Sequence, residues 1–197
     1  MSNKPKVSFM RLRQLAMITA LTMVTSCNSV DGLMSNVSTV GQVSSSYREN
    51  AYPIAGLNRD MWVIVTGSVP GSDAAALQQQ TLAAMQRHAG IKTHFTATPQ
   101  NHSQEYKTVM LFNGSNTING DELCRNPSPQ SATAASGNEV RLQAVFCRYD
   151  RYLTEVTGRV GGGNSLSNPN FGALIRQTMT DMYAAPRVQQ RNEPDEG

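Results

Sequence analysis

The strongest constraint on the fold is an apolar stripe near the C-terminus. Six residues recur at the spacing of one helix face: Phe171, Leu174, Ile175, Thr178, Met179 and Met182. This periodicity predicts an amphipathic helix. Asn168 and Pro169 predict its start, as the N-cap and the first helical residue, and Pro186 predicts its end. Such a helix must cover an apolar surface, and the only neighbouring one long enough to receive it is a β-sheet.

Earlier segments predict that sheet. The β-branched run at 61–66 is typical of a strand buried on both faces, and residues 139–149 alternate between apolar and polar side chains. An alanine-rich segment at 74–89 predicts a second helix. Further strands are expected at 93–98, 106–112 and 152–160. The order β-α-β-β-β-β-α predicts an α+β fold, a two-layer sandwich of about five strands and two helices.

The last two strands present a problem of register. In the first of them, Val140, Leu142, Ala144 and Phe146 face one way, and Arg141, Gln143 and Cys147 face the other. A two-residue turn at Asp150 and Arg151 would then pair the wrong faces of the two strands. The sequence therefore predicts a longer loop or a β-bulge in this hairpin.

The N-terminus has the features of a secretory signal peptide. Four basic residues and no acidic residue precede a short apolar run at 15–24. The run is about half the ~20 residues that span a bilayer. It leads into Val24-Thr25-Ser26-Cys27, which resembles the lipobox of bacterial lipoprotein precursors.

This resemblance implies that Cys27 carries a diacylglycerol, that the chain is cut before it and that the new N-terminus is acylated. The mature protein would then be anchored to a bacterial membrane without spanning it. Asn28 follows the cysteine, where an Asp often retains such proteins at the inner membrane, so the resemblance implies the outer membrane and a domain that faces the periplasm. The expected segments are a signal peptide at 1–26, a flexible tether at 27–50, one globular domain at 51–185 and a disordered tail at 186–197.

The remaining cysteines agree with export. Cys124 and Cys147 are expected to form a disulfide, because an oxidising compartment favours one. Neither a C-x₂-C nor an H-x₃-H spacing occurs, so no metal site is expected. Without residues 1–26 the chain has 13 basic and 14 acidic residues. This balance argues against nucleic acid as a partner, and no polybasic segment for anionic lipid is present.

No motif identifies a reaction or a cofactor. The glycines at 158–163 match neither a P-loop nor G-x-G-x-x-G, and G-x-S-x-G does not occur. Asp121, Glu122 and Glu155 are the carboxylates considered for acid–base chemistry. We expect a non-enzymatic envelope lipoprotein whose domain binds another envelope protein or has a structural role. The alternatives are a periplasmic hydrolase that acts on cell wall or another polymer, and a carrier of a small ligand or lipid. The element order weakly resembles small α+β domains of uncharacterised outer-membrane lipoproteins.

Overall fold

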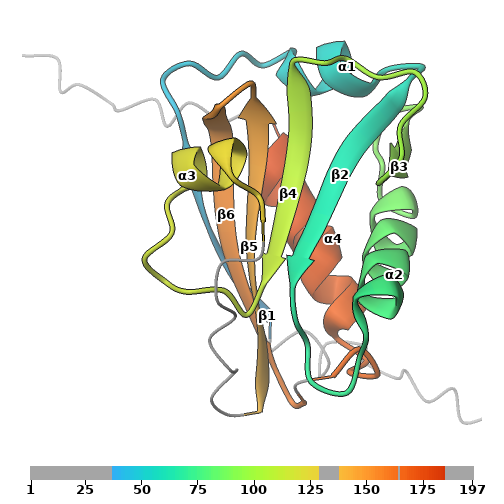
Figure 1. The fold of residues 1–197 in the computed structure, drawn as a ribbon, viewed down its shortest axis with the longest axis vertical. Helices are drawn as coiled ribbons and strands as arrows, with labels where there is room; N and C mark the ends of the chain where they lie inside the picture. Colours follow the sequence, from blue (N-terminus) through green and yellow to red (C-terminus); the bar gives the residue numbers. More distant parts are fainter. Residues whose placement is uncertain (1–36, 129–137, 164, 185–197) are drawn as a thin grey trace, which may run out of the picture.

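A computed structural model describes residues 37–128, 138–163 and 165–184. It contains a six-stranded mixed sheet in the order β1-β6-β5-β4-β2-β3 (Figure 1). The strands are β1 (Val37–Val43), β2 (Asp60–Gly67), β3 (His94–Thr96), β4 (Tyr106–Phe112), β5 (Glu139–Arg148) and β6 (Arg151–Gly161). The helices are α1 (Ala51–Gly56), α2 (Ala74–Gln86), α3 (Gly120–Arg125) and α4 (Phe171–Tyr183). The signal peptide, Cys27 and the tail at 186–197 lie outside the described residues.

The α+β class is confirmed, but the numbers of strands and helices are not. The sheet has six strands instead of five, and α1 and α3 add to the two expected helices. Strand β1 lies in the range predicted as a tether and pairs antiparallel with β6 from Val37 opposite Val160 to Val43 opposite Thr154. Most of its side chains are exposed, so the segment lacks the apolar signal by which a strand is recognised.

Helices α2 and α4 cover one face of the sheet, and α1 lies at one end (Figure 1). The six residues of the C-terminal stripe are all buried, as predicted. Helix α4 packs tightly on the sheet at Gly158 of β6, where an added Cβ would lie 2.7 Å from Leu174 Cδ1 and 3.2 Å from Thr178 Oγ1. Tyr52 of α1 stacks on Tyr183 of α4, with ring centroids 4.0 Å apart, and so joins α1 to the same core.

The start of α4 differs from the prediction. The helix begins at Phe171 and its N-cap is Asn170, whose side chain makes no capping hydrogen bond. Asn168 organises the preceding turn instead. Its Oδ1 accepts from the Asn170 N–H at 2.9 Å, and its amide donates to the carbonyls of Gly161 and Gly163. Pro169 therefore precedes the helix.

The expected bulge is present in the last hairpin. Cys147 lies opposite Tyr152 and Phe146 lies opposite Thr154, so Leu153 is the additional residue on β6. Because of this single residue, Val156, Gly158 and Val160 face the helices. Without the bulge, Glu155, Thr157 and Arg159 would point into the core.

The contact between α4 and Gly158 yields a stability prediction. In residues 28–197, Leu174→Ala should lower the free energy of unfolding by about 2–5 kcal/mol, because Leu174 is fully buried. Gly158→Ala should cost about 1–3 kcal/mol by overpacking. In the double variant the new methyl occupies space that Leu174 has left, so we expect a loss smaller than the sum. Chemical denaturation measures all three.

Gln177→Ala is the matched control for this prediction. Gln177 lies on the exposed side of the same helix, so its replacement should change stability by less than about 0.5 kcal/mol. A denaturation midpoint that Leu174→Ala leaves unchanged would contradict the packing of α4 on the sheet.

Candidate binding pocket on the open face of the sheet

Of the helices that the structure describes, only the short helix α3 lies on the second face of the sheet, where it packs on β5 and β6 (Figure 1). The predicted disulfide lies here and joins Cys124 of α3 to Cys147 of β5, with their Cα atoms 5.7 Å apart. Both cysteines belong to a small buried cluster with Val109, Leu111, Ile118, Leu123 and Val145. The disulfide thus holds α3 on a face that otherwise has little helical cover.

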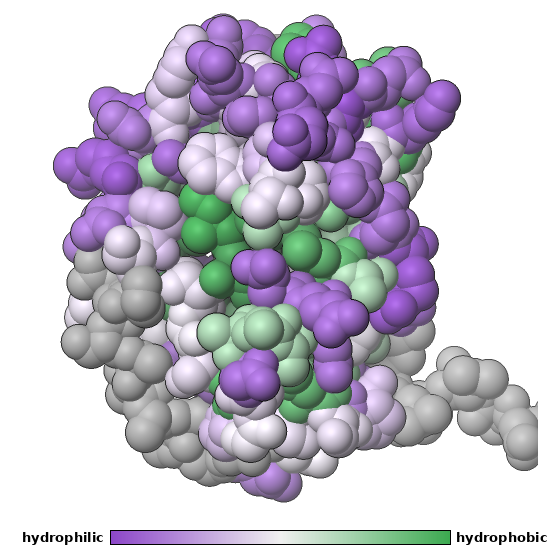
Figure 2. Space-filling model, turned by 45° about the vertical axis from the view of Figure 1, so that its right-hand side comes forward, coloured by the Kyte–Doolittle hydropathy of each residue, from purple (hydrophilic) through white to green (hydrophobic). Residues whose placement is uncertain are grey.

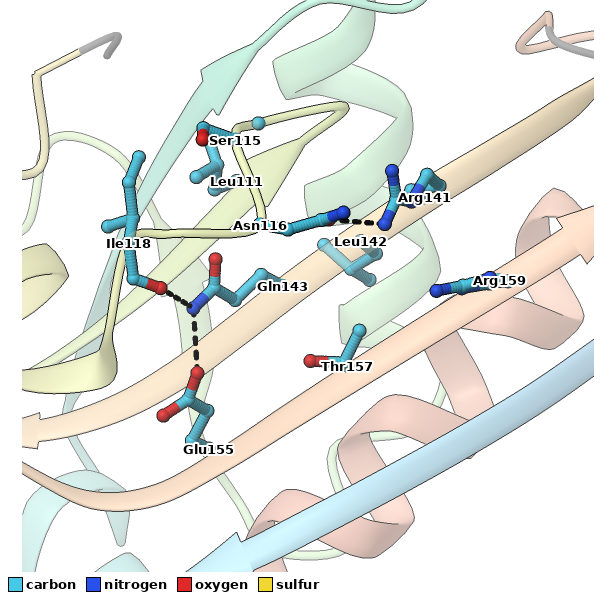
Figure 3. Close-up of a pocket in the computed structure, with 11 residues that line it drawn as sticks. Leu111, Ser115, Asn116, Ile118, Arg141, Leu142, Gln143, Glu155, Thr157 and Arg159 are labelled. Atoms are coloured by element: carbon cyan, nitrogen blue, oxygen red, sulfur yellow. Dashed lines mark hydrogen bonds between the residues drawn. The ribbon is translucent and has the colours of Figure 1, made fainter. Parts of the chain in front are cut away.

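A pocket of about 220 Å³ lies on this face, between β5, β6 and the loop that joins β4 to α3 (Figure 3). Its lining is mostly polar, and the charged side chains come from the two long strands. The lining residues are Leu111, Gly114, Ser115, Asn116, Ile118, Arg141, Leu142, Gln143, Glu155, Thr157 and Arg159.

Asn113 fixes the loop that closes the pocket. Strand β4 ends at Phe112, and Asn113 takes a left-handed conformation with φ of 51°. Its buried side chain donates to the Ser68 carbonyl at 2.8 Å and accepts from the Arg141 N–H at 2.9 Å. It thereby ties the end of β4 to β5 and to the residue after β2. Asparagine suits this position because it tolerates a positive φ better than most residues.

Glu155 forms the acidic end of the pocket. One carboxylate oxygen accepts from Gln143 Nε2 at 2.7 Å (Figure 3). The other accepts from the Gly120 N–H at 3.2 Å. Gln143 also donates to the Ile118 carbonyl at 2.8 Å. The carboxylate is therefore held by neutral donors from β5 and α3, and no described basic side chain pairs with it.

Arg141 and Arg159 form the basic end. They lie directly opposite each other on β5 and β6, both on the face away from α2 and α4. Arg141 donates to Asn116 Oδ1, and its Nε lies 3.8 Å from Glu139 Oε1 (Figure 3). Among the residues that the structure describes, Arg159 has no ion-pair partner. The pocket thus places two guanidinium groups at one end and a carboxylate at the other.

The structure separates the roles of the carboxylates considered for catalysis. Asp121 accepts from Arg151 at 2.7 Å and from the Tyr152 N–H at 3.0 Å. The Tyr152 N–H, followed by the Arg151 guanidinium, lowers the pKa of Asp121. Glu122 lies in the first turn of α3 and does not line the pocket. Asp121 and Glu155 are thus each held by different groups, and no acid–base pair forms across the pocket.

The other motifs have structural roles. Gly158 makes room for α4, and Gly162 and Gly163 turn the chain with positive φ. His94 pairs with Asp60 at 3.2 Å. Within residues 37–128, 138–163 and 165–184, no three His, Cys, Asp or Glu side chains are grouped closely enough to hold a metal ion.

Sequence reasoning did not identify this pocket. The alternation in β5 placed Arg141 and Gln143 on the non-core face, but nothing in the sequence indicated that Arg159 lies opposite Arg141 or that a loop encloses the space between them. One signal was available in the sequence: the hairpin needs a bulge. A bulge shifts the register of the hairpin, and the register decides which residues of β6 lie on the same face as Arg141.

Figure 2 shows a side of the molecule on which hydrophobic and hydrophilic residues occupy separate areas. In Figure 2 the hydrophobic residues of the face shown gather in a central area, bordered by hydrophilic residues above and at the right. The large apolar side chains that are exposed are scattered over several elements: Val40, Val43, Ile54, Leu57 and Tyr149. None of the described helices combines the length and the hydrophobicity that crossing a membrane requires.

Thiol counting tests the disulfide. The denatured, unreduced protein should contain no free thiol from Cys124 or Cys147. Reduction of the disulfide should lower the free energy of unfolding by about 3 kcal/mol, because the bond joins cysteines that are 23 residues apart in the sequence. Two reactive thiols before reduction would contradict the pairing.

The role of Asn113 can be separated into its two parts. Asn113→Gly keeps the positive φ without strain but removes both side-chain hydrogen bonds, so we expect a loss of about 1–3 kcal/mol. Asn113→Ala should lose about 1 kcal/mol more, because alanine disfavours this conformation. Denaturation of residues 28–197 measures both. A glycine variant as stable as the unaltered protein would show that these hydrogen bonds do not hold the loop.

Comparison with known proteins identifies no family. No family model matches the chain, and no curated protein matches it. Two solved structures of the PelC dodecamer from Paraburkholderia phytofirmans are similar in fold. One is a single-substitution variant, with 12% identity and a TM-score of 0.43, and the other has 10% identity and a TM-score of 0.44. Each match covers 75% of this chain and 98% of the PelC chain. This likeness carries no inference about function.

Proposed function

We propose that this chain is a lipid-anchored protein of the bacterial cell envelope whose domain binds a ligand without transforming it. The observation that carries the proposal is the disulfide between Cys124 and Cys147, which lies inside the fold. Disulfides persist in exported proteins and are rare in the cytosol. The bond therefore supports the same compartment as the lipobox-like ending at Cys27.

Strand β1 limits how far the domain can stand from such an anchor. Nine residues, 28–36, separate Cys27 from the first residue of the sheet. Even fully extended, this segment reaches no more than about 35 Å. The predicted tether of 27–50 is therefore too long, because β1 begins at Val37. A domain attached through Cys27 would act close to the membrane surface.

The chemistry of the pocket favours binding over hydrolysis. Asp121, considered for acid–base chemistry, does not line the pocket, and a backbone N–H donor lowers its pKa, whereas a general acid needs a raised pKa. The Ser115 hydroxyl contacts the Thr117 hydroxyl at 2.9 Å, and no basic side chain among the described residues is bonded to it. A lipid carrier would need an enclosed apolar cavity, and the pocket is lined mainly by polar side chains. Binding of a polar ligand is the role that these groups support best.

An envelope protein as partner stays a prediction. The large apolar side chains that are exposed among the described residues lie on different elements and do not by themselves mark one docking surface. Crosslinking of intact cells, followed by isolation of the protein from membranes, is the experiment that would identify such a partner.

Fatty-acid labelling tests the anchor. The unaltered protein should incorporate labelled fatty acid and sediment with membranes, and Cys27→Ser should abolish the label, because Cys27 is the proposed attachment site. The matched control replaces both Cys124 and Cys147 with Ser, which should leave the label unchanged. Labelling that persists in Cys27→Ser would contradict the lipoprotein proposal.

A further inference from the structure

The positive charges of Arg141 and Arg159 are poorly balanced by the acidic side chains that the structure describes. Like charges that face each other directly across neighbouring strands destabilise a sheet. Arg141 and Arg159 are such a pair. The contact of Arg141 with Glu139 is long, at 3.8 Å, and Arg159 has no ion-pair partner among the described residues. A group that accepts hydrogen bonds from both guanidiniums would remove this repulsion.

We propose that Arg141 and Arg159 bind a phosphate group. Each guanidinium presents a planar fork of N–H donors. A carboxylate is matched by one such fork, whereas a phosphate group has enough oxygens to accept from two forks at once. Asn116 adds to the site, because its Oδ1 accepts from Arg141 and its amide donors remain for an acceptor in the pocket.

Glu155 restricts which phosphate compounds fit. Its carboxylate lines the same pocket, four residues before Arg159 on β6, and would repel a second anionic group. The volume of about 220 Å³ greatly exceeds the roughly 30 Å³ share of one water molecule, so the pocket has room for a phosphate group and the atoms next to it. The site therefore favours a single phosphate over a polyanion.

The position of the site points to lipid headgroups as the source of this phosphate. On its other side Arg159 lies opposite Ser38, the second residue of β1. The basic end of the pocket is thus beside the place where the chain enters the sheet from Cys27. This choice of source rests on the proposed anchor. A soluble phosphate compound is the other source of the same chemistry.

The test uses the protein isolated in dodecyl maltoside, a detergent without phosphate. Inorganic phosphate is added, and the side-chain Nε–Hε resonances of the arginines are followed by ¹H–¹⁵N NMR. We expect saturable shifts of Arg141 and Arg159. Arg159→Gln should weaken binding at least about fivefold, and Glu155→Gln should strengthen it about twofold. Arg151→Gln is the matched control, because it removes the same charge from β6 outside the pocket and should leave affinity unchanged.

The second arm replaces inorganic phosphate with phosphatidylglycerol mixed into the micelles. Shifts of the same two arginines, with loss of the Arg141 shift in Arg159→Gln, would support lipid headgroups as the source. Phosphate binding without a response to the lipid would support the site and overturn the lipid source. Absence of saturation, or equal responses in Arg159→Gln and Arg151→Gln, would overturn the site itself. Fatty-acid labelling of Cys27 is measured separately, so failure of the anchor is distinguishable from failure of the site.

Discussion

The packing of α4 on the sheet is the interaction on which the rest of the structure depends. Leu174 and Ile175 are completely buried, and the glycine at 158 lets the helix approach β6 closely enough for Leu174 to fill the space above it. Burial of side chains of this size contributes about 1.5–3 kcal/mol each, which makes the stripe a large part of a domain's marginal stability. Helices α2 and α4 occupy this face, and among the described helices α3 alone covers the other.

The register of the last hairpin decides which charged side chains lie on the open face of the sheet. The additional residue Leu153 turns Val156 and Val160 toward α4 and leaves Glu155 and Arg159 on the opposite face. The same shift brings Arg159 opposite Arg141. A bulge that is needed for the core therefore also assembles the charges of the pocket. Core packing and the candidate site are two consequences of one irregularity in β6.

Two further devices hold the pocket in shape. The disulfide fixes α3 to β5, and the first N–H of α3, that of Gly120, supports the Glu155 carboxylate. Asn113 ties the loop after β4 to β5 through its amide oxygen and to Ser68, the residue after β2, through its amide nitrogen. The side chains that line the pocket are thus positioned by neighbours in the sheet and in α3, as expected for a preformed binding site.

The sequence by itself determined the elements with a strong periodic pattern. The stripe of α4, the apolar run of β2, the alternation of β5, the need for a bulge and the pairing of Cys124 with Cys147 could all be predicted, because each is a local pattern or a count of one residue type. Tertiary structure alone decided the rest. Strand β1 has few buried side chains and exists through its backbone pairing with β6. The pocket exists because Arg141, Glu155 and Asn116, far apart in the chain, meet once sheet order and register are set, and these depend on long-range contacts that no single segment encodes.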